Sequence, residues 1–200
     1  MNQATRVIDP DKIHVGDIVL VATGTWITQY VQRRLGLGDR SKWTHVAGSL
    51  GGYDLIEGQV PRSRVADLQK DYVAKGFEIK VMRKRQWNCD NDRVKVALWW
   101  ATLNNLRYNF FGLMWFGLAC FMGKGLLLLR NEFNNMGKEF CSELLADGFY
   151  KQNYYLFGRP AADVLPANYD DSSLFEEVVS IWGVNNLSNR PLATLTNPDD

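Results

Sequence analysis

Residues 43–47 read WTHVA and residues 140–145 read FCSELL, and these two distant stretches decide how the chain is interpreted. Cys141 stands at the start of a predicted helix, where the positive end of the helix dipole and the free backbone N–H groups favour a thiolate. His45 opens a predicted strand and can accept the thiol proton and later return it to a leaving group. Together the two residues indicate a cysteine nucleophile with a histidine general base.

Glu57 is the candidate that orients His45. Strands are predicted over 44–50 and 53–59, joined through the glycines at 51 and 52. A connection of three residues, 50–52, places His45 and Glu57 directly opposite each other, whereas a strict two-residue turn places them on opposite faces. A carboxylate beside the imidazole fixes its tautomer and stabilises the imidazolium.

Each of these residues also has an ordinary structural interpretation. Cys141 suits a small buried hydrophobe, His45 a hydrogen-bonded residue at a strand edge, and Glu57 a solvent-facing carboxylate. Taken singly, Cys141 and His45 fit the structural interpretation better, and Glu57 is evenly balanced. The case for a functional site therefore depends on the three occurring together, in the order base, acid, nucleophile.

The rest of the chain predicts a mixture of helices and strands. A strand is expected over Ile18–Ala22, a helix from Trp26 to Leu35 that stops at Gly36, and a strand over 77–82. Residues 62–75 are expected to form a short helix and loop. Further elements are a helix from Asp90 or Asp92 to Asn105, a helix over 140–151 and a strand over 174–182. Apolar residues recur at helical spacing in the first helix, at Trp26, Ile27, Tyr30, Val31 and Leu35. The expected buried stripe of the second is Val94, Ala97, Leu98 and Ala101.

Composition bounds the organisation and the partners. The 200 residues are 46% hydrophobic and 22% charged, which is typical of a folded globular chain. We expect a single catalytic domain over 1–183 and a polar tail over 184–200. The 23 Lys and Arg against 22 Asp and Glu leave a net charge of +1, so nucleic acid is not an expected partner.

Cysteine and histidine usage argues against a metal site. Cys89, Cys120 and Cys141 form no CxxC pair, and His14 and His45 are the two histidines of the chain, so a zinc site is not expected. Reduced thiols and a polar N-terminus without the apolar core of a secretory signal predict synthesis in a cytoplasm. Export would then need a dedicated secretion system.

The segment 110–129, FFGLMWFGLACFMGKGLLLL, is strongly apolar. Its length would suffice to cross a bilayer, but it contains Lys124 and lies between His45 and Cys141, which a single crossing would separate. A buried helix with a loop is the main expectation. The alternatives are an apolar wall of the substrate cleft and a surface that contacts a membrane or lipid.

Several of these stretches also resemble a known group of proteins. They are GDIVL at 16–20, WTHVA at 43–47, IE at 56–57, FCSEL at 140–144, LP at 165–166 and SLF at 173–175. Over residues 16–182 the chain resembles the circularly permuted branch of the NlpC-type papain-like superfamily, and within it the YiiX-like proteins. The resemblance implies an α+β papain-like fold with a small antiparallel sheet packed against the helix that carries Cys141. It also implies a Cys–His–acid site of Cys141, His45 and Glu57.

Members of that superfamily act as cell-wall peptidases or amidases, relatives act on lipid acyl chains, and some are delivered toxins. The first hypothesis is therefore a thiol-dependent hydrolase of amide bonds in peptidoglycan peptides, with no cofactor. As an antibacterial effector it would have a delivery protein and an immunity protein as partners. The second hypothesis is a lipid acyltransferase or lipase, and the third is a non-catalytic binding module.

Overall fold

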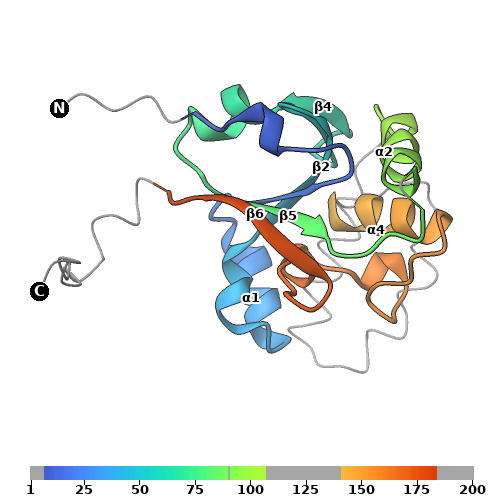
Figure 1. The fold of residues 1–200 in the computed structure, drawn as a ribbon. Coiled ribbons are helices and arrows are strands. Elements are labelled where there is room, and N and C mark those ends of the chain that lie inside the picture. The colour runs from blue at the N-terminus through green and yellow to red at the C-terminus, as the bar shows by residue number, and fades with distance from the viewer. Residues whose placement is uncertain (1–6, 90, 107–140, 184–200) are drawn as a thin grey trace, which may run out of the picture.

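The described strands form one antiparallel sheet. The computed structural model describes residues 7–89, 91–106 and 141–183. Strand order across the sheet is β4-β3-β2-β1-β5-β6, and each neighbouring pair is antiparallel (Figure 1). The strands are β1 (Ile18–Ala22), β2 (His45–Gly51), β3 (Asp54–Glu57), β4 (Arg64–Asp67), β5 (Glu78–Lys84) and β6 (Phe175–Ile181).

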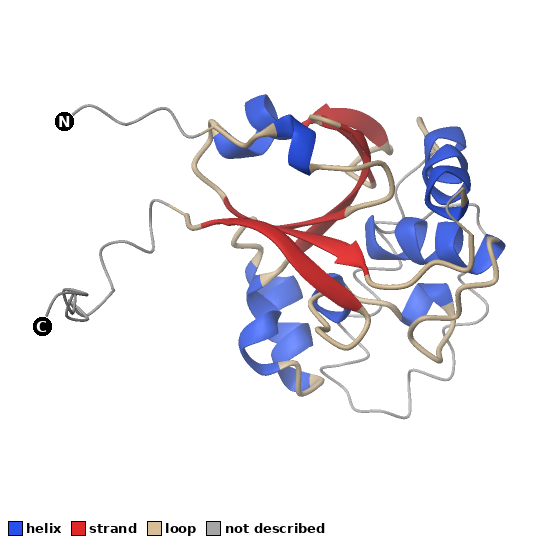
Figure 2. Ribbon diagram, viewed as in Figure 1, coloured by secondary structure: helices blue, strands red, loops and turns tan. Residues whose placement is uncertain are grey.

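Helices lie on both sides of this sheet, which gives the described chain a mixed α+β architecture (Figure 2). The α-helices are α1 (Trp26–Arg34), α2 (Asp92–Thr102) and α4 (Cys141–Lys151). The shorter helical segments are η1 (Pro10–Lys12), η2 (Gly38–Lys42), η3 (Leu68–Val73), η6 (Ala161–Asp163) and η7 (Pro166–Tyr169). The α+β class expected from the sequence is therefore confirmed.

Alternation along the strands divides the interior into two hydrophobic clusters, because successive side chains point to opposite faces. The first cluster joins one face of the sheet to α2 and α4, and it includes Ile18, Leu20, Val46, Ile56, Trp100 and Leu145. The second joins the other face to η3 and to the segment before β1, and it includes Val19, Val21, Ala47, Leu55, Tyr72 and Ile13. All of these residues are buried.

Helix α4 lies very close to β2. A Cβ added to Gly48 would be 2.5 Å from Cε3 of Trp100 and 2.8 Å from Cδ2 of Leu145. A Cβ added to Gly148 would be 2.1 Å from Nε1 of Trp100. Two glycines therefore admit the Trp100 ring between β2 and α4, and its Nε1 donates to the Leu145 carbonyl at 3.1 Å. This packing fixes the start of α4 relative to β2.

The predicted position of α1 is correct, but most of the apolar residues that indicated the helix are exposed. Trp26 is 73% exposed, and Ile27, Tyr30 and Leu35 are also exposed, whereas Val31 is buried as expected. The other buried residue of the helix is Gln32. Its amide donates to the carbonyls of Ser41 and Trp43 and accepts from the N–H of Ala167, which removes the cost of burying a polar group.

The predicted stripe of α2 is correct at Ala97 and wrong at Val94, Leu98 and Ala101. Val94 and Leu98 are exposed, and the residues that face the core are Val96, Ala97 and Trp100. The large indole of Trp100 decides the orientation because it fills the space over Gly48.

The stretch 62–75 contains a strand that the sequence did not predict. Residues 64–67 form β4, which pairs with β3, and η3 follows. Predictions for segment 110–129, the tail 184–200 and the thiol of Cys120 fall outside the described residues. Within the described ranges no helix is long and apolar enough to cross a membrane.

Candidate active site

Cys141 is the first residue of α4, as the sequence predicted. The next residue anchors this end of the helix. The Ser142 hydroxyl donates to the Val164 carbonyl at 2.6 Å, and the Tyr169 hydroxyl donates to the Ser142 carbonyl at 2.9 Å. The sulfur thus sits at the positively polarised end of a helix that is held in place, and Cys141 itself is 6% exposed.

His45 and Glu57 are in contact across β2 and β3. His45 Nε2 and Glu57 Oε2 are 2.8 Å apart. The expected register is wrong by two residues, because Glu57 lies opposite Ala47 rather than His45. The expectation that both side chains lie on the same face of the sheet is confirmed. The turn alone would place them on opposite faces, and a bulge between Ser49 and Gly51 brings them back to one face. The side chains therefore meet diagonally on one face of the sheet.

Cys141 and His45 approach each other where their two elements begin. Val46 and Gly48 of β2 face α4, so alternation turns His45 toward η3, where its ring stacks on Tyr72 at 6.0 Å between centroids. His45 opens β2 and Cys141 opens α4, and their side chains are hydrogen-bonded there. Because Nε2 contacts Glu57, Nδ1 is the ring nitrogen left for the sulfur.

The imidazole is held in its protonated form. Burial alone lowers the pKa of His45, but the Cys141 sulfur and the Glu57 carboxylate outweigh burial and raise this pKa to about 10. The side chain of His45 is 13% exposed, so solvent screens these charges little. An imidazolium beside a cysteine sulfur at a helix N-terminus favours the thiolate, which is the nucleophilic form.

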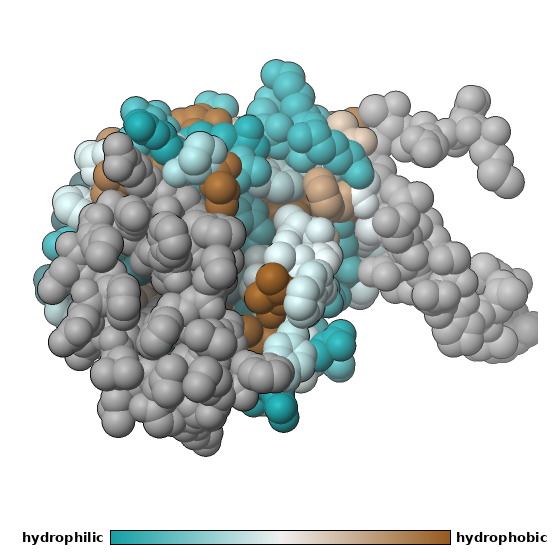
Figure 3. Space-filling model, turned by 180° about the vertical axis from the view of Figure 1, so that it is seen from behind, coloured by the Kyte–Doolittle hydropathy of each residue, from teal (hydrophilic) through white to brown (hydrophobic). Residues whose placement is uncertain are grey.

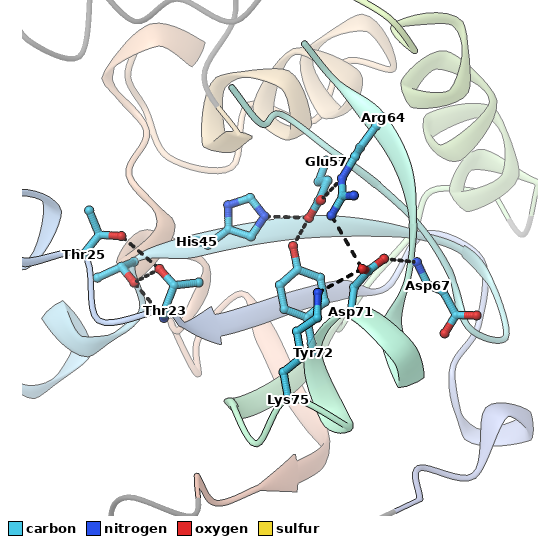
Figure 4. Close-up of polar contacts among 10 residues, drawn as sticks. Thr23, Thr25, His45, Glu57, Arg64, Asp67, Asp71, Tyr72 and Lys75 are labelled. Carbon is cyan, nitrogen blue, oxygen red and sulfur yellow. Dashed lines mark hydrogen bonds and ion pairs between the residues drawn. The ribbon is translucent and has the colours of Figure 1, made fainter. Parts of the chain in front are cut away.

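Glu57 is a fully buried carboxylate surrounded by donors (Figure 4). Oε2 accepts from His45 Nε2 and from the hydroxyl of Tyr72, and Oε1 accepts from Arg64 Nε at 2.8 Å. Burial alone would raise the pKa of Glu57, but these hydrogen bonds, with His45 first, lower it below the usual value. Glu57 is thus an ionised acceptor, which places a proton on His45 Nε2.

These side chains open into a cleft of about 510 Å³ whose lining includes His45 and Cys141. One wall carries hydroxyls: Thr23 Oγ1 is 3.0 Å from Thr25 Oγ1 and 2.8 Å from Thr44 Oγ1 (Figure 4). The lining also includes charged and aromatic groups, namely Arg64, Asp71, Tyr72, Lys75 and Phe77. Cys141 and His45 therefore border the cleft, and Cys141 also belongs to the first hydrophobic cluster.

Arg64, Tyr72 and the three threonines were not identified from the sequence. Arg64 and Tyr72 lie in the stretch 62–75, which was expected to be a short helix and loop. Recognising β4 as a strand would have given a signal for Arg64, because the β3–β4 register places it directly opposite Glu57. Tyr72 had no comparable signal, because it reaches Glu57 from the irregular turn of η3.

Several other histidine, cysteine and charged side chains lie apart from the three predicted site residues. His14 is exposed and lies outside the cleft lining. Cys89 and Cys141 are both free thiols. Arg83 is engaged by Asp17, whose carboxylate accepts from Nε and Nη2 at 2.8 Å. Within the described residues no group of His, Cys, Asp or Glu side chains is arranged to hold a metal ion.

Sequence comparisons identify no relative, and a structural comparison does. No family model and no curated protein matches the chain. The fold is similar to the crystal structure of the metalloprotein yiiX from Escherichia coli O157:H7, with a TM-score of 0.55 and 14% sequence identity. The match covers 86% of this chain and 99% of that chain. This similarity concerns the fold, and the chain therefore has a YiiX-like α+β fold.

Proposed function

We propose that this protein is a cysteine hydrolase that cleaves amide bonds, with Cys141 as nucleophile, His45 as general base and acid, and Glu57 as the residue that orients His45. One observation carries the proposal: the imidazole of His45 contacts the sulfur on one side and a buried carboxylate at 2.8 Å on the other, in an open cleft. A purely structural histidine would not need all three features together.

The reaction follows from these positions. The Cys141 sulfur attacks the carbonyl carbon, and the backbone N–H of Cys141 stabilises the oxyanion that forms. His45 gives its proton to the amine as the C–N bond breaks, which leaves a thioester on Cys141. Water then attacks the thioester while His45 accepts a proton from it, and the C–S bond breaks to release the acid. His45 and Cys141 end in their starting protonation states, so the cycle balances without an added reagent.

The finer fold assignment is part of the same proposal. We propose a circularly permuted papain-like arrangement, in which the strands that carry the base and its acid precede the helix that carries the nucleophile. In support, His45 and Glu57 lie on β2 and β3, and Cys141 opens α4 much later in the chain. The antiparallel sheet packs against that helix through the Gly48 contact.

The proposed substrate is a peptide of peptidoglycan, and the proposed role is that of a delivered antibacterial effector. Cleavage of an amide within a stem peptide uses the chemistry above, and the hydroxyl-lined wall of Thr23, Thr25 and Thr44 offers hydrogen bonds to a peptide backbone. A delivery protein and an immunity protein are the partners that such a role requires.

The test is digestion of purified peptidoglycan and muropeptides, followed by mass spectrometry of the products. The parent protein is compared with C141A and with C89A, which removes the exposed thiol and serves as the matched control. We expect new amine and carboxylate ends with the parent and C89A and none with C141A. Equal products from the parent and C141A would overturn the proposal, and absence of cleavage by all three would favour a non-catalytic binding module.

A lipid acyl group is the second candidate substrate. The same thioester chemistry applies to an ester, and α1 exposes Trp26, Ile27 and Tyr30 beside the cleft, which Thr25 and Thr28 line. Viewed from behind, hydrophobic side chains in brown reach the surface among hydrophilic ones in teal (Figure 3). Incubation with phospholipid vesicles distinguishes the two: an acyl group on Cys141, without action on muropeptides, would identify the lipid reaction.

A further inference from the structure

We infer that Arg64 and Tyr72 are positioning residues, which hold the buried Glu57 carboxylate against His45 and so keep the base in its working orientation. This inference rests on the proposed function, because it concerns the group that orients the base. It adds two residues to the site, neither of which touches the reacting atoms in the mechanism above.

Glu57 depends on its donors because no water reaches it. Its side chain has 0% exposure, and a buried carboxylate without hydrogen-bond donors takes up a proton or moves. Arg64 Nε donates a hydrogen bond to Glu57 Oε1 at 2.8 Å. The Tyr72 hydroxyl and His45 Nε2 both donate to Glu57 Oε2 (Figure 4). Two donors from outside the catalytic triad thus fix the plane and direction of the carboxylate.

The surrounding structure in turn fixes these donors. Arg64 pairs with Glu57 in the register of β3 and β4, and its Nη2 lies 3.9 Å from Asp71 Oδ1. Asp71 is held by the Lys75 ammonium at 3.2 Å and by the backbone N–H of Asp67 at 3.0 Å. The side chain of Arg64 is 43% exposed, so solvent screens its charge. Its main effect on Glu57 is therefore to orient the carboxylate through the hydrogen bond.

Tyr72 acts as a neutral donor. Its ring lies against His45 and against Phe77 at 5.9 Å between centroids, which aims the hydroxyl at Glu57. Burial and the Glu57 carboxylate raise the pKa of Tyr72, so the hydroxyl keeps its proton at every pH at which the site would work. Removing this hydroxyl therefore changes a hydrogen bond and leaves the net charge of the site unchanged.

Charge and position make opposite predictions for Arg64. The titratable and charged groups around His45 and Glu57 are Arg64 from β4, Asp71, Tyr72 and Lys75 from η3 and its end, and Cys141 from α4. If Arg64 acted through its charge alone, removing that cation would make His45 easier to protonate. If it holds Glu57 in place, its removal frees or neutralises the carboxylate, and His45 becomes harder to protonate.

The experiment follows the imidazole of His45 by NMR between pH 5 and pH 11, a window that brackets the pKa of about 10. A His14→Ala background leaves His45 as the single imidazole, because the chain has two histidines. The test variants are R64L and Y72F. Their matched controls are R62L, which removes a nearby arginine that contacts Asn105, and Y53F, which removes a hydroxyl that donates to the Ile8 carbonyl. R64K tests whether a cation without the guanidinium geometry restores the His45 titration midpoint.

We expect the His45 titration midpoint to fall by about one pH unit in R64L and by a smaller amount in Y72F, on the scale of a lost hydrogen-bonded partner. R62L and Y53F should match the parent, and R64K should recover part of the shift. Because the lowered midpoint of R64L still lies well above pH 7, the imidazole stays protonated there, and the alkylation rate of Cys141 at pH 7 should stay close to that of the parent. An unchanged midpoint in Y72F together with an unchanged or raised midpoint in R64L would overturn the inference.

The design separates this inference from the proposed function. If His45→Ala leaves Cys141 alkylation unchanged in the parent background, the proposed function itself fails. If His45 controls alkylation but R64L and Y72F titrate like the parent, only the positioning role fails. Y72F retains both ring contacts, so it tests the idea even if R64L proves too unstable to purify.

Discussion

Replacing Glu57 with Gln is the most informative perturbation of the site, because it keeps the shape of the side chain and removes its charge. Glu57 accepts through both oxygens, Oε1 from Arg64 and Oε2 from His45 and Tyr72. An amide offers one oxygen and one NH₂ group. If the oxygen stays with Arg64, the NH₂ group faces His45 Nε2 and can only donate to it. Nε2 then loses its proton, and the neutral ring keeps its one proton on Nδ1, toward the sulfur of Cys141, so His45 has no free nitrogen there to accept the thiol proton.

The size of the effect follows from the contacts that change. The ion pairs of Glu57 with His45 and with Arg64 each become contacts with an uncharged amide, and each loses about 1 kcal/mol, so the free energy of unfolding should fall by about 2 kcal/mol. The wrong tautomer costs much more in catalysis. In serine hydrolases the same carboxylate-to-amide change lowers kcat by about 10⁴-fold, equivalent to about 5 kcal/mol. We expect a loss of that order in muropeptide cleavage by E57Q.

The assay combines the rate of amide cleavage at pH 7, urea unfolding, and the ¹⁵N shifts of the His45 ring. The predicted result is a folded E57Q protein with the proton on Nδ1 and a nearly complete loss of activity. Cleavage at the parental rate by E57Q, or an imidazole that keeps its proton on Nε2, would refute the assignment of Glu57 as the orienting group.

Two further predictions concern packing and pH. Gly48→Ala places a methyl group 2.5 Å from the buried ring of Trp100. We therefore expect urea unfolding to show a loss of about 2 kcal/mol in stability, which is typical of overpacking, and Cys141 to be alkylated more slowly. Unchanged stability would show that β2 and α4 can separate freely. The raised pKa of His45 predicts a contribution to stability that is fully present below pH 6.5 and is lost as the pH rises through about 10. Thermal unfolding should therefore show that the parent loses more stability than H45Q over that pH range. Parallel stability curves for the two proteins would contradict the prediction.

The candidate site was predictable from the sequence because it depends on parity and position. Side chains alternate between the two faces of a strand, so His45 and Glu57 share one face when the connection between the strands has an odd number of residues. The bulge between Ser49 and Gly51 supplies the extra residue. The exact partner was not predictable, since a bulge shifts the register by an amount that the turn residues do not specify. The side-chain contact survives because His45 and Glu57 are long enough to meet diagonally.

The buried face of α1 was not predictable from its hydrophobic pattern. Trp26, Ile27 and Tyr30 recur at helical spacing, yet the buried residues of the helix are Val31 and the polar Gln32. Its three hydrogen bonds to backbone groups of distant segments make that burial favourable, and those segments come together only in the folded chain. A periodicity argument counts apolar residues and has no access to such partners.

Strand β4 was missed for a related reason. Its sequence, Arg64-Val65-Ala66-Asp67, is short and carries charge at both ends, which is unusual for a predicted strand. Backbone pairing with β3 and the burial of Ala66 are enough to order it at the edge of the sheet. Arg64, one of the two charged residues that make this stretch unlike a typical strand, is the residue that contacts Glu57.

The most direct test of the account is the pH dependence of Cys141 alkylation by iodoacetamide. A C89A/C120A background makes Cys141 the single thiol of the chain, and the same background carrying H45A removes the imidazole. We predict that Cys141 reacts at least about tenfold faster at pH 6 with His45 present, because the imidazolium stabilises the thiolate. Superimposable pH profiles for the two proteins would contradict the central claim that His45 activates Cys141.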